Sequence, residues 1–389
     1  KSAKIRQISV NTLPDYILVG ILLVVCGIGI FQARTRQYLV TDLKSMLGTV
    51  IVSMAVIASI KRLIASGCDV IEFLFVFLNR YFVLNDILIV IQSVIPYFLM
   101  NRKAIASVNN RAYFDQLTGF LGINGTTRWD IWSIAIIILN FYVAYKRNDN
   151  RIIKYNIFFF LASIIICMIN SARSFLIIAP VTVLIYLFLI REVEFSNRMK
   201  QIFAVFGVLI VALIIYSSNR YVNDYVNDLI NDKFAIYLSG DVEHMVAAND
   251  DRAVATYYAV ENCGTFGVGI GAVSMHSTNN QVKYLGLNSA SSYIYMLGVA
   301  GYFLWTLCLA RIGIDSDKGS IKKTLLYFVY LLLLSYFLPI YSAIALFPVI
   351  MFIFYIFDLP YGAFDISFPN KKGTVKTAPR FDITYRTNY

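Results

Sequence analysis

Residues 174–190 read SFLIIAPVTVLIYLFLI, seventeen consecutive positions without a charged side chain. A helix of this length nearly crosses the hydrocarbon core of a bilayer, which takes about 20 residues. Similar apolar runs of 15 to 20 residues recur along the chain and predict further helices. We expect these near 16–31, 43–60, 70–84, 86–100, 129–145, 153–170, 201–217, 290–310, 323–338 and 340–357. The sequence therefore predicts an all-α, polytopic integral membrane protein with about 10–12 transmembrane helices.

The composition supports the same class. The chain has 389 residues, of which 58% are hydrophobic and 15% charged, whereas a soluble domain carries about 25% charged residues. The net charge of +11 is unevenly spread: residues 218–289 carry −4, and the remainder carries +15. The basic residues gather in short connections between apolar runs, where they set membrane orientation. We therefore interpret the excess as topology and expect no nucleic-acid partner.

Three short connections are rich in lysine and arginine, at 146–154, 191–200 and 311–323. The positive-inside rule places all three in the cytoplasm. The loop 101–128, the turn 171–174 and the long loop 218–289 then face outward, and the C-terminus faces inward. The membrane orientation of the N-terminal part is not determined by this rule. Either 70–84 is a short or interfacial helix that does not cross, which leaves Arg34 and Arg36 outside, or a first span is absent from this sequence.

The predicted organisation has four parts. Transmembrane helices fill 1–217, including the outer loop 101–128 and the turn 171–174. A large extracytoplasmic loop covers 218–289, further transmembrane helices cover 290–358, and a cytoplasmic tail covers 359–389. Five cysteines without a paired spacing and only two histidines predict no disulfide framework and no metal site. We expect no metal and no cofactor.

Arg173 stands in MINSARSFLI, residues 168–177, between two apolar runs. An arginine at that depth costs several kcal/mol and usually lines a cavity or meets a partner. The alternative is an arginine whose head group reaches the outer interface. Because basic residues are disfavoured on the outer side, the first interpretation gains weight.

Arg252 stands in NDDRAVATYYAVENCGTFGVGIG, within the long loop. The segment 252–262 predicts an amphipathic helix that begins after Asp250 and Asp251, two residues suited to a helix N-terminus. The positions spaced to pack or cap that helix are Val254, Tyr257, Tyr258 and Glu261. Alternatively, Arg252 is a surface partner of the two aspartates.

Glycines follow that predicted helix and also interrupt the earlier outer loop. Gly264, Gly267, Gly269 and Gly271 allow a tight turn or the close approach of a ligand, but no P-loop pattern accompanies them. Gly119 lies in YFDQLTGFLGINGTTRW, residues 113–129, which predicts a turn-rich lid or lining. The nearby Trp129 and Trp132 are interpreted as interfacial anchors rather than sugar platforms.

Taken in order, these stretches resemble the O-antigen ligase and polymerase superfamily, and most of all its Wzy-type polysaccharide polymerases. The resemblance covers roughly residues 113–310 and rests on the order of four loose motifs. They are TGFLGING at 118–125, SARS at 171–174, DDRAVATYYAVENCGTFGVGIG at 250–271, and SSYIYMLGVAG at 291–301. Many ligase-type members carry a His-Asn pair ahead of the last motif, where this chain has Ala290 and Ser291 with Asn288 nearby. That departure favours a polymerase.

The resemblance implies a GT-C-like helical fold and metal-independent transfer of a glycan from undecaprenyl diphosphate. Arg173 and Arg252 would then clamp the diphosphate, since guanidinium groups match phosphate oxygens in pairs. His276, Glu261 and Asp251 are candidates for the base that accepts the acceptor proton, and His276 is our catalytic choice. The expected substrate-binding residues are Asp251, Gly267, Gly269, Gly271, Asn288 and Gly119.

The expected function is polymerisation of lipid-linked repeat units of O-antigen, capsule or exopolysaccharide in the bacterial cytoplasmic membrane. The expected partners are the lipid-linked glycan donor and acceptor and membrane lipids, with a chain-length regulator and a flippase of the same pathway as further candidates. A ligase that passes the finished glycan to another acceptor is a close alternative. A lipid-linked oligosaccharide flippase is another, although transporters often show repeats and this chain shows none. A third is a non-catalytic assembly partner, which would not need both arginines.

Overall fold

The structure, a computed structural model, describes residues 13–33, 36–95, 117–122, 125–170, 172, 174–189, 207, 251–273, 285–312, 321–341 and 344–359. Within these ranges the regular elements are helices, and no strand is found. The expected all-helical class is confirmed for this part of the chain. The expected number of spans and the full outer loop 218–289 extend beyond the described residues.

The helices follow the predicted apolar runs closely, with two exceptions treated below. Their bounds are α1 (Leu13–Phe31), α2 (Arg36–Ala65), α3 (Val70–Val94), η2 (Gly119–Leu121), α5 (Thr126–Arg147), α6 (Asn150–Ile169), α7 (Phe175–Leu189), α12 (Asp251–Asn262), η4 (Leu285–Leu287), α14 (Ser289–Ile312), α15 (Ile321–Phe337) and α16 (Phe347–Asp358).

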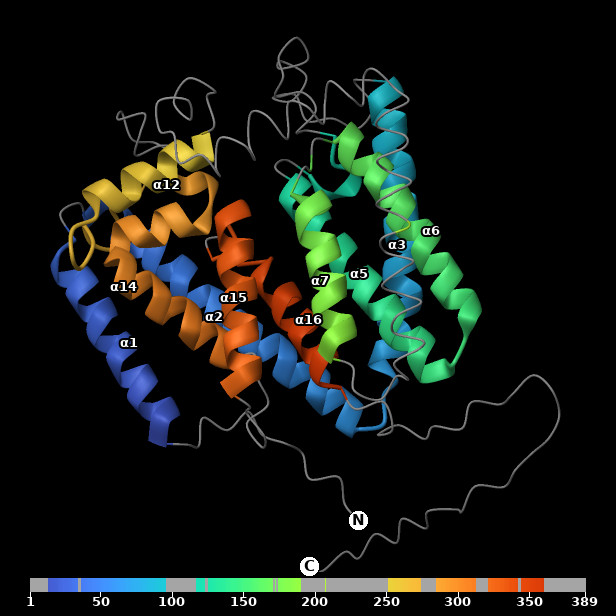
Figure 1. The fold of residues 1–389 in the computed structure, drawn as a ribbon, viewed down its shortest axis with the longest axis horizontal. Helices are drawn as coiled ribbons and strands as arrows, with labels where there is room; N and C mark the ends of the chain where they lie inside the picture. Colours follow the sequence, from blue (N-terminus) through green and yellow to red (C-terminus); the bar gives the residue numbers. More distant parts are fainter. Residues whose placement is uncertain are drawn as a thin grey trace, which may run out of the picture.

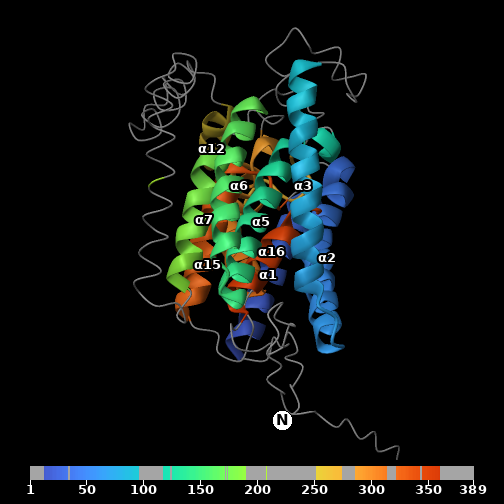
Figure 2. The ribbon, with the colours of Figure 1, turned by 90° about the vertical axis from the view of Figure 1, so that its right-hand side faces the viewer.

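The helices form two groups, and the central helices α2 and α16 lie between them (Figure 1). In one group α14 packs against α1, α12 and α15, and in the other α5 packs against α3, α6 and α7. The central helix α16 contacts both α2 and α5. Figure 2 shows α3, α5, α6 and α7 running alongside one another. In the view of Figure 1, α12 lies across the upper end of α14, at the end of the bundle where α5 begins.

Four of the described helices are long and apolar enough to cross a membrane: Tyr38–Ile64, Val70–Val94, Asn150–Ile169 and Ser289–Ile312. Their outer faces remain apolar. On α3, for example, the exposed side chains include Phe73, Phe77 and Leu84, with 65%, 50% and 59% of their surface accessible. Since water would oppose such exposure and lipid would not, these faces indicate a membrane protein.

The predicted break between 70–84 and 86–100 is wrong, because α3 is a single helix from Val70 to Val94. Asp69 caps its start by accepting a hydrogen bond from the Glu72 amide at 3.1 Å. Asn79, one of the polar residues that made 70–84 doubtful as a span, is buried and bonded to Asn140 of α5 instead of exposed to lipid. One helix therefore replaces two predicted spans, and 70–84 is part of a helix long enough to cross a membrane rather than a separate interfacial helix.

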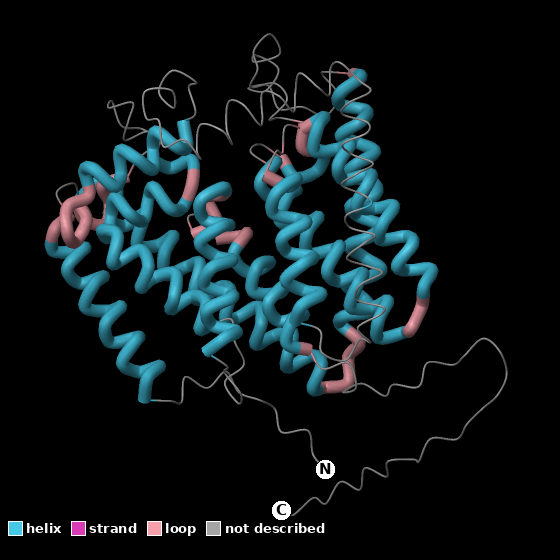
Figure 3. Tube along the Cα trace, in the orientation of Figure 1, coloured by secondary structure: helices cyan, strands magenta, loops and turns pink. Residues whose placement is uncertain are grey.

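The second exception is the connection between α15 and α16. The predicted spans 323–338 and 340–357 left only one residue for it. Here the chain leaves α15 after Phe337 and resumes α16 only at Phe347. Figure 3 shows this loop within the bundle rather than at its end. Its backbone is satisfied internally, since the Tyr341 amide donates to Ser289 Oγ at 2.8 Å and Thr49 Oγ1 donates to the Tyr341 carbonyl at 3.0 Å. Irregular backbone at this depth is tolerated where protein surrounds it.

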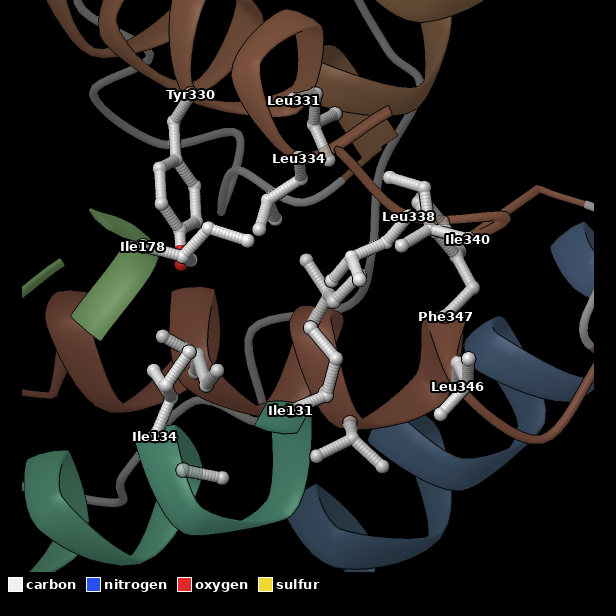
Figure 4. Close-up of a cluster of buried hydrophobic side chains, with 14 of the residues drawn as sticks. Ile131, Ile134, Ile178, Tyr330, Leu331, Leu334, Leu338, Ile340, Leu346 and Phe347 are labelled. Atoms are coloured by element: carbon white, nitrogen blue, oxygen red, sulfur yellow. The ribbon is translucent and has the colours of Figure 1, made fainter. Parts of the chain in front are cut away.

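Buried apolar side chains join the two groups beneath this loop (Figure 4). Ile131 and Ile134 of α5 and Ile178 of α7 share one buried cluster with residues of α15, α16 and the loop between them: Tyr330, Leu331, Leu334, Leu338, Ile340, Leu346 and Phe347. A hydroxyl pair reinforces it, because Thr182 of α7 and Tyr330 of α15 lie 2.6 Å apart. The packing therefore fixes α5 and α7 relative to α15, and so fixes the ends of these helices where polar residues gather.

A buried amide network joins three helices of the second group. Asn79 of α3 and Asn140 of α5 exchange hydrogen bonds of 2.8 and 3.1 Å, and Asn140 also donates to Asn156 of α6 at 3.1 Å. Asn156 in turn donates to the Ile137 carbonyl at 3.0 Å. In an apolar surrounding these amides have few other partners, so the network fixes the alignment of the three helices.

Replacing Asn140 by leucine is expected to lower the free energy of unfolding by about 1–3 kcal/mol, because the amides of Asn79 and Asn156 lose a buried partner. Thermal unfolding of the detergent-purified protein measures the effect. Asn262→Ala is the control, since that amide is exposed at the end of α12. Equal melting temperatures for Asn140→Leu and the wild type would contradict a stabilising role for the network.

Candidate functional site

Asp130, in the second turn of α5, is hydrogen-bonded to the segment that precedes α7. The Asp130 side chain is 1% exposed. Ser174, just before α7, donates a short hydrogen bond to Asp130 Oδ2. The positive charge of Arg252, in the first turn of α12, interacts electrostatically with the Asp130 carboxylate. We call Asp130, Ser174 and Arg252 the Asp130 cluster.

The cluster contains polar atoms without hydrogen-bond partners. Asp130 Oδ1 is buried and has none, and neither has Nδ2 of Asn170, four residues before Ser174 at the end of α6. The other amide atom of Asn170 accepts a bond of 3.1 Å from the Ala172 backbone N–H, which shapes the connection toward α7. Buried polar atoms are normally satisfied, so the Asp130 carboxylate retains capacity for a further hydrogen bond.

The predicted helix over 252–262 is confirmed, since α12 runs from Asp251 to Asn262. Its buried face differs from the prediction. Ala255 and Ala259 are buried, whereas Tyr257 and Glu261 are exposed. Tyr258 is half-buried and its ring lies 6.0 Å from the Tyr295 ring of α14. Small alanines in the contact face allow α12 to lie close on α14, and the spacing of large residues alone did not reveal this.

Asn288 links α12 to α14. Its Oδ1 accepts the Ser291 amide at 2.7 Å and so caps the start of α14. Its Nδ2 donates to Thr256 Oγ1 on α12 at 3.3 Å. Both ends of the side chain amide are therefore engaged in holding the helix that carries Arg252. The proposed role of Asn288 in substrate binding stays a prediction.

The glycine-rich segment after α12 is bound to two transmembrane helices through its backbone. The Val268 and Gly269 amides donate to the Tyr295 and Met296 carbonyls at 2.8 and 3.1 Å, and the Ile270 amide donates to the Gly29 carbonyl at 2.9 Å. These bonds are possible because α14 is interrupted at Gly298, whose φ of 74° and ψ of 168° are not helical. The segment therefore anchors the C-terminal side of α12 to α14 and α1.

This geometry explains why glycines stand here without invoking a ligand. A Cβ at Gly269 would lie 2.6 Å from the Ala33 backbone nitrogen, and one at Gly271 would lie 2.6 Å from that of Leu39. The Gly271 amide also donates to the Asp42 carboxylate of α2. Substrate binding by Gly267, Gly269 and Gly271 stays a prediction, and close backbone contact is the role that the structure shows.

The outer loop containing Gly119 is fastened to α3. The Gly119 amide donates to Gln92 Oε1 at 3.0 Å, and the Phe120 amide donates to Asn85 Oδ1 at 2.7 Å. Gly119 has a φ of +61°, and a Cβ on it would overlap the Asn85 side chain. This loop therefore covers α3, and the substrate-binding role predicted for Gly119 stays untested by these contacts.

The interpretation of Trp129 as an interfacial anchor is wrong. Its side chain is completely buried, its Nε1 donates to Asp86 Oδ1 at 2.7 Å, and its ring lies 5.2 Å from the Phe175 ring. Trp132 is half-buried and its ring lies 6.4 Å from the Phe82 ring. Both rings pack between helices, and Trp129 holds Asp86 and the start of α7 beside Asp130.

Some expected site residues lie outside the described part of the chain. Arg173 and His276 are among them, and of Asp251 only the backbone, at the start of α12, is described. Sequence reasoning missed Asp130 and Ser174. Asp130 was visible as the acidic residue in TRWDIW, at the start of a long apolar run, where an ionisable side chain is itself a functional signal. Within the described ranges, no three His, Cys, Asp or Glu side chains come together to form a candidate metal site.

Comparison of the chain with protein-family models, with curated proteins and with solved structures gave no match in any of the three cases.

Proposed function

We propose that this chain polymerises undecaprenyl-diphosphate-linked oligosaccharide repeat units at the outer face of the bacterial cytoplasmic membrane. The growing glycan would pass from its carrier to the next lipid-linked unit, in O-antigen, capsule or exopolysaccharide synthesis. The observation that carries the proposal is that the charge of Arg252, on α12, acts on Asp130 of α5, whose carboxylate accepts a hydrogen bond from Ser174. In the sequence, Ser174 directly follows Arg173, the other predicted arginine.

The chemistry requires a cationic site on an apolar scaffold. The acceptor hydroxyl attacks the anomeric carbon, the bond between that carbon and the diphosphate oxygen breaks, and undecaprenyl diphosphate leaves with the electron pair. The hydroxyl proton passes to a base, for which His276, Glu261 and Asp251 are the candidates. Negative charge grows on the departing diphosphate, where preoriented guanidinium groups stabilise it most.

The position of α12 supports this assignment. Arg252 stands at the start of α12, whose backbone N–H groups are available to an anion as at any helix N-terminus. The helix is fastened near its middle through Asn288 and at its C-terminal end through the glycine-rich segment. A rigid support of this kind keeps a catalytic group oriented before the substrate arrives. The apolar faces of α2 and α3 fit a protein whose substrates are carried by lipids.

The experiment is a gel of lipid-linked glycans from cells that lack this protein, with and without a wild-type copy. Single repeat units in the deletion strain and a restored ladder with the wild type would support the polymerase. Full-length chains retained on their carrier would instead assign the protein as a ligase. Repeat units trapped on the inner leaflet would assign it as a transporter. An unchanged glycan pattern in the deletion strain would reject all three.

A further inference from the structure

We propose that the interface between α3, α5 and α6 contains a binding site for a small monovalent cation, Na⁺, formed by Asp86, Ser133 and Ser163. The site does not depend on the proposed function. The expectation that the protein binds no metal rested on its histidines and cysteines. Hard cations such as Na⁺ instead take oxygen ligands, which carboxylate and hydroxyl groups supply.

The first step is the register of α3 on α5. Arg147 of α5 forms an ion pair with Glu72 of α3. Seven residues nearer to the start of α5, Asn140 exchanges hydrogen bonds with Asn79, which stands seven residues after Glu72. The two helices are therefore antiparallel, and facing positions recur at intervals of seven residues, about two turns of each helix.

The next interval brings Ser133 of α5 to the level of Asp86 of α3. Ser133 stands seven residues before Asn140, and Asp86 stands seven residues after Asn79. Both lie about 10 Å along the bundle from the two amides, at 1.5 Å per residue. A direct contact supports this level, since Trp129, one turn before Ser133 on α5, donates from Nε1 to Asp86 Oδ1 at 2.7 Å.

The third helix contributes Ser163. After a short turn α6 returns antiparallel to α5 and beside it (Figure 2). Asn140 donates to Asn156 of α6 at 3.1 Å, and Ser163 stands seven residues after Asn156. The same interval therefore places Ser163 at the level of Ser133 and Asp86. We call these three residues the Asp86 layer.

Both hydroxyls of this layer are buried and lack a hydrogen-bond partner. Ser133 and Ser163 are 0% exposed, and the Oγ atom of each bonds to no other residue. In a helix such a hydroxyl often donates to the carbonyl one turn earlier, as Thr182 does to Ile178 at 2.7 Å. The two serines make no such bond, so both oxygen atoms retain the capacity to bind a ligand between the helices.

The carboxylate of the layer determines the charge of that ligand. Asp86 belongs to a helix long enough to cross a membrane, and the indole that bonds to it is neutral. Within the described ranges, no lysine or arginine forms an ion pair with it. A carboxylate in an apolar surrounding is costly without an opposite charge. A monovalent cation would balance it, whereas a divalent cation would leave one positive charge uncompensated.

Thermal unfolding of the full-length protein in detergent tests the site, with NaCl compared to choline chloride at equal concentrations. A ligand that binds only the folded state raises the melting temperature as its concentration rises. Na⁺ is therefore expected to raise the melting temperature to a plateau that choline does not reach. Equal melting temperatures in the two salts at every concentration would overturn the site, and a water molecule held by the two hydroxyls would give that result.

Three variants locate the bound cation. Asp86→Asn keeps an acceptor for the Trp129 indole and removes the charge, so this variant should fold and no longer respond to Na⁺. Ser133→Ala and Ser163→Ala should each weaken the apparent affinity for Na⁺ by about tenfold or more, since even a group that only orients a metal ligand contributes that much. In choline both alanine variants should be at least as stable as the wild type, because no hydrogen bond is lost.

Asp69→Asn and Ser93→Ala are the matched controls on α3. Asp69 caps the start of the helix, and asparagine caps a helix equally well. Ser93 donates to the carbonyl of Val90 at 2.7 Å and is not part of the layer. Both controls should respond to Na⁺ as the wild type does. The same response from Asp86→Asn or from both serine variants would overturn the assignment, whatever the glycan gel shows about the proposed function.

Discussion

Replacing Arg252 by glutamine is expected to reduce the glycan ladder by about 100-fold or more, because removing one preoriented group that stabilises a transition-state charge costs that much in other enzymes. Glutamine keeps the length and polarity of the side chain and removes the charge. Unpolymerised repeat units should accumulate in the cell. The measurement is the ratio of ladder to single units in the deletion strain that carries the variant.

Two further variants sharpen this result. Arg252→Lys keeps the charge but not the forked geometry, so an intermediate ladder is expected if paired phosphate contacts matter. Arg128→Gln removes an exposed arginine from the same end of the bundle, where it donates to the Leu121 carbonyl at 3.1 Å. That control should polymerise normally. A wild-type ladder from Arg252→Gln would show that Arg252 is not part of the reacting site.

Replacing Gly267 by alanine is expected to destabilise the protein by about 3 kcal/mol, at the upper end for an added methyl group in a packed interior. The new Cβ would overlap the carbonyl oxygen of Met296, which is backbone and cannot rotate away. The segment that anchors α12 would have to leave the kink at Gly298. Both the amount of folded protein and the activity should fall, as measured by thermal unfolding and by the glycan gel.

Gly264→Ala separates the steric effect from the backbone effect. Both glycines have positive φ, +64° at Gly264 and +85° at Gly267, so both substitutions carry the cost of about 1 kcal/mol for a left-handed residue. Only Gly267 has backbone in the way, because nothing lies within 4 Å of a Cβ at Gly264. If both variants lose the same stability, the close contact with α14 does not explain the glycine.

Several local features were predictable from the sequence because their causes are local. The apolar runs predicted helices, since a chain in lipid must satisfy its backbone within each segment. The helix over 252–262 followed from its periodicity and from the aspartates ahead of it. The tight connection between α6 and α7 followed from the few residues separating two apolar runs.

The errors came from polar residues whose partners are distant in sequence. Asn79 was among the polar residues that made 70–84 doubtful as a span, although Asn140 of α5 bonds to it within one continuous helix. Trp129 was predicted to be an interfacial anchor, but its indole N–H is bonded to Asp86. In each case the residue type is unfavourable by itself in an apolar helix, and its long-range partner removes the cost.

The sequence by itself determined that this protein is helical and built for a membrane, because hydropathy and charge act residue by residue. It also singled out Arg252 as a candidate. Only the tertiary structure decided that Asp130 and Ser174 are hydrogen-bonded, that the charge of Arg252 acts on Asp130, and that the glycines after α12 pack on the backbones of α1, α2 and α14. Those contacts depend on how the helices pack, and packing arises from many shape and distance constraints that no local pattern contains.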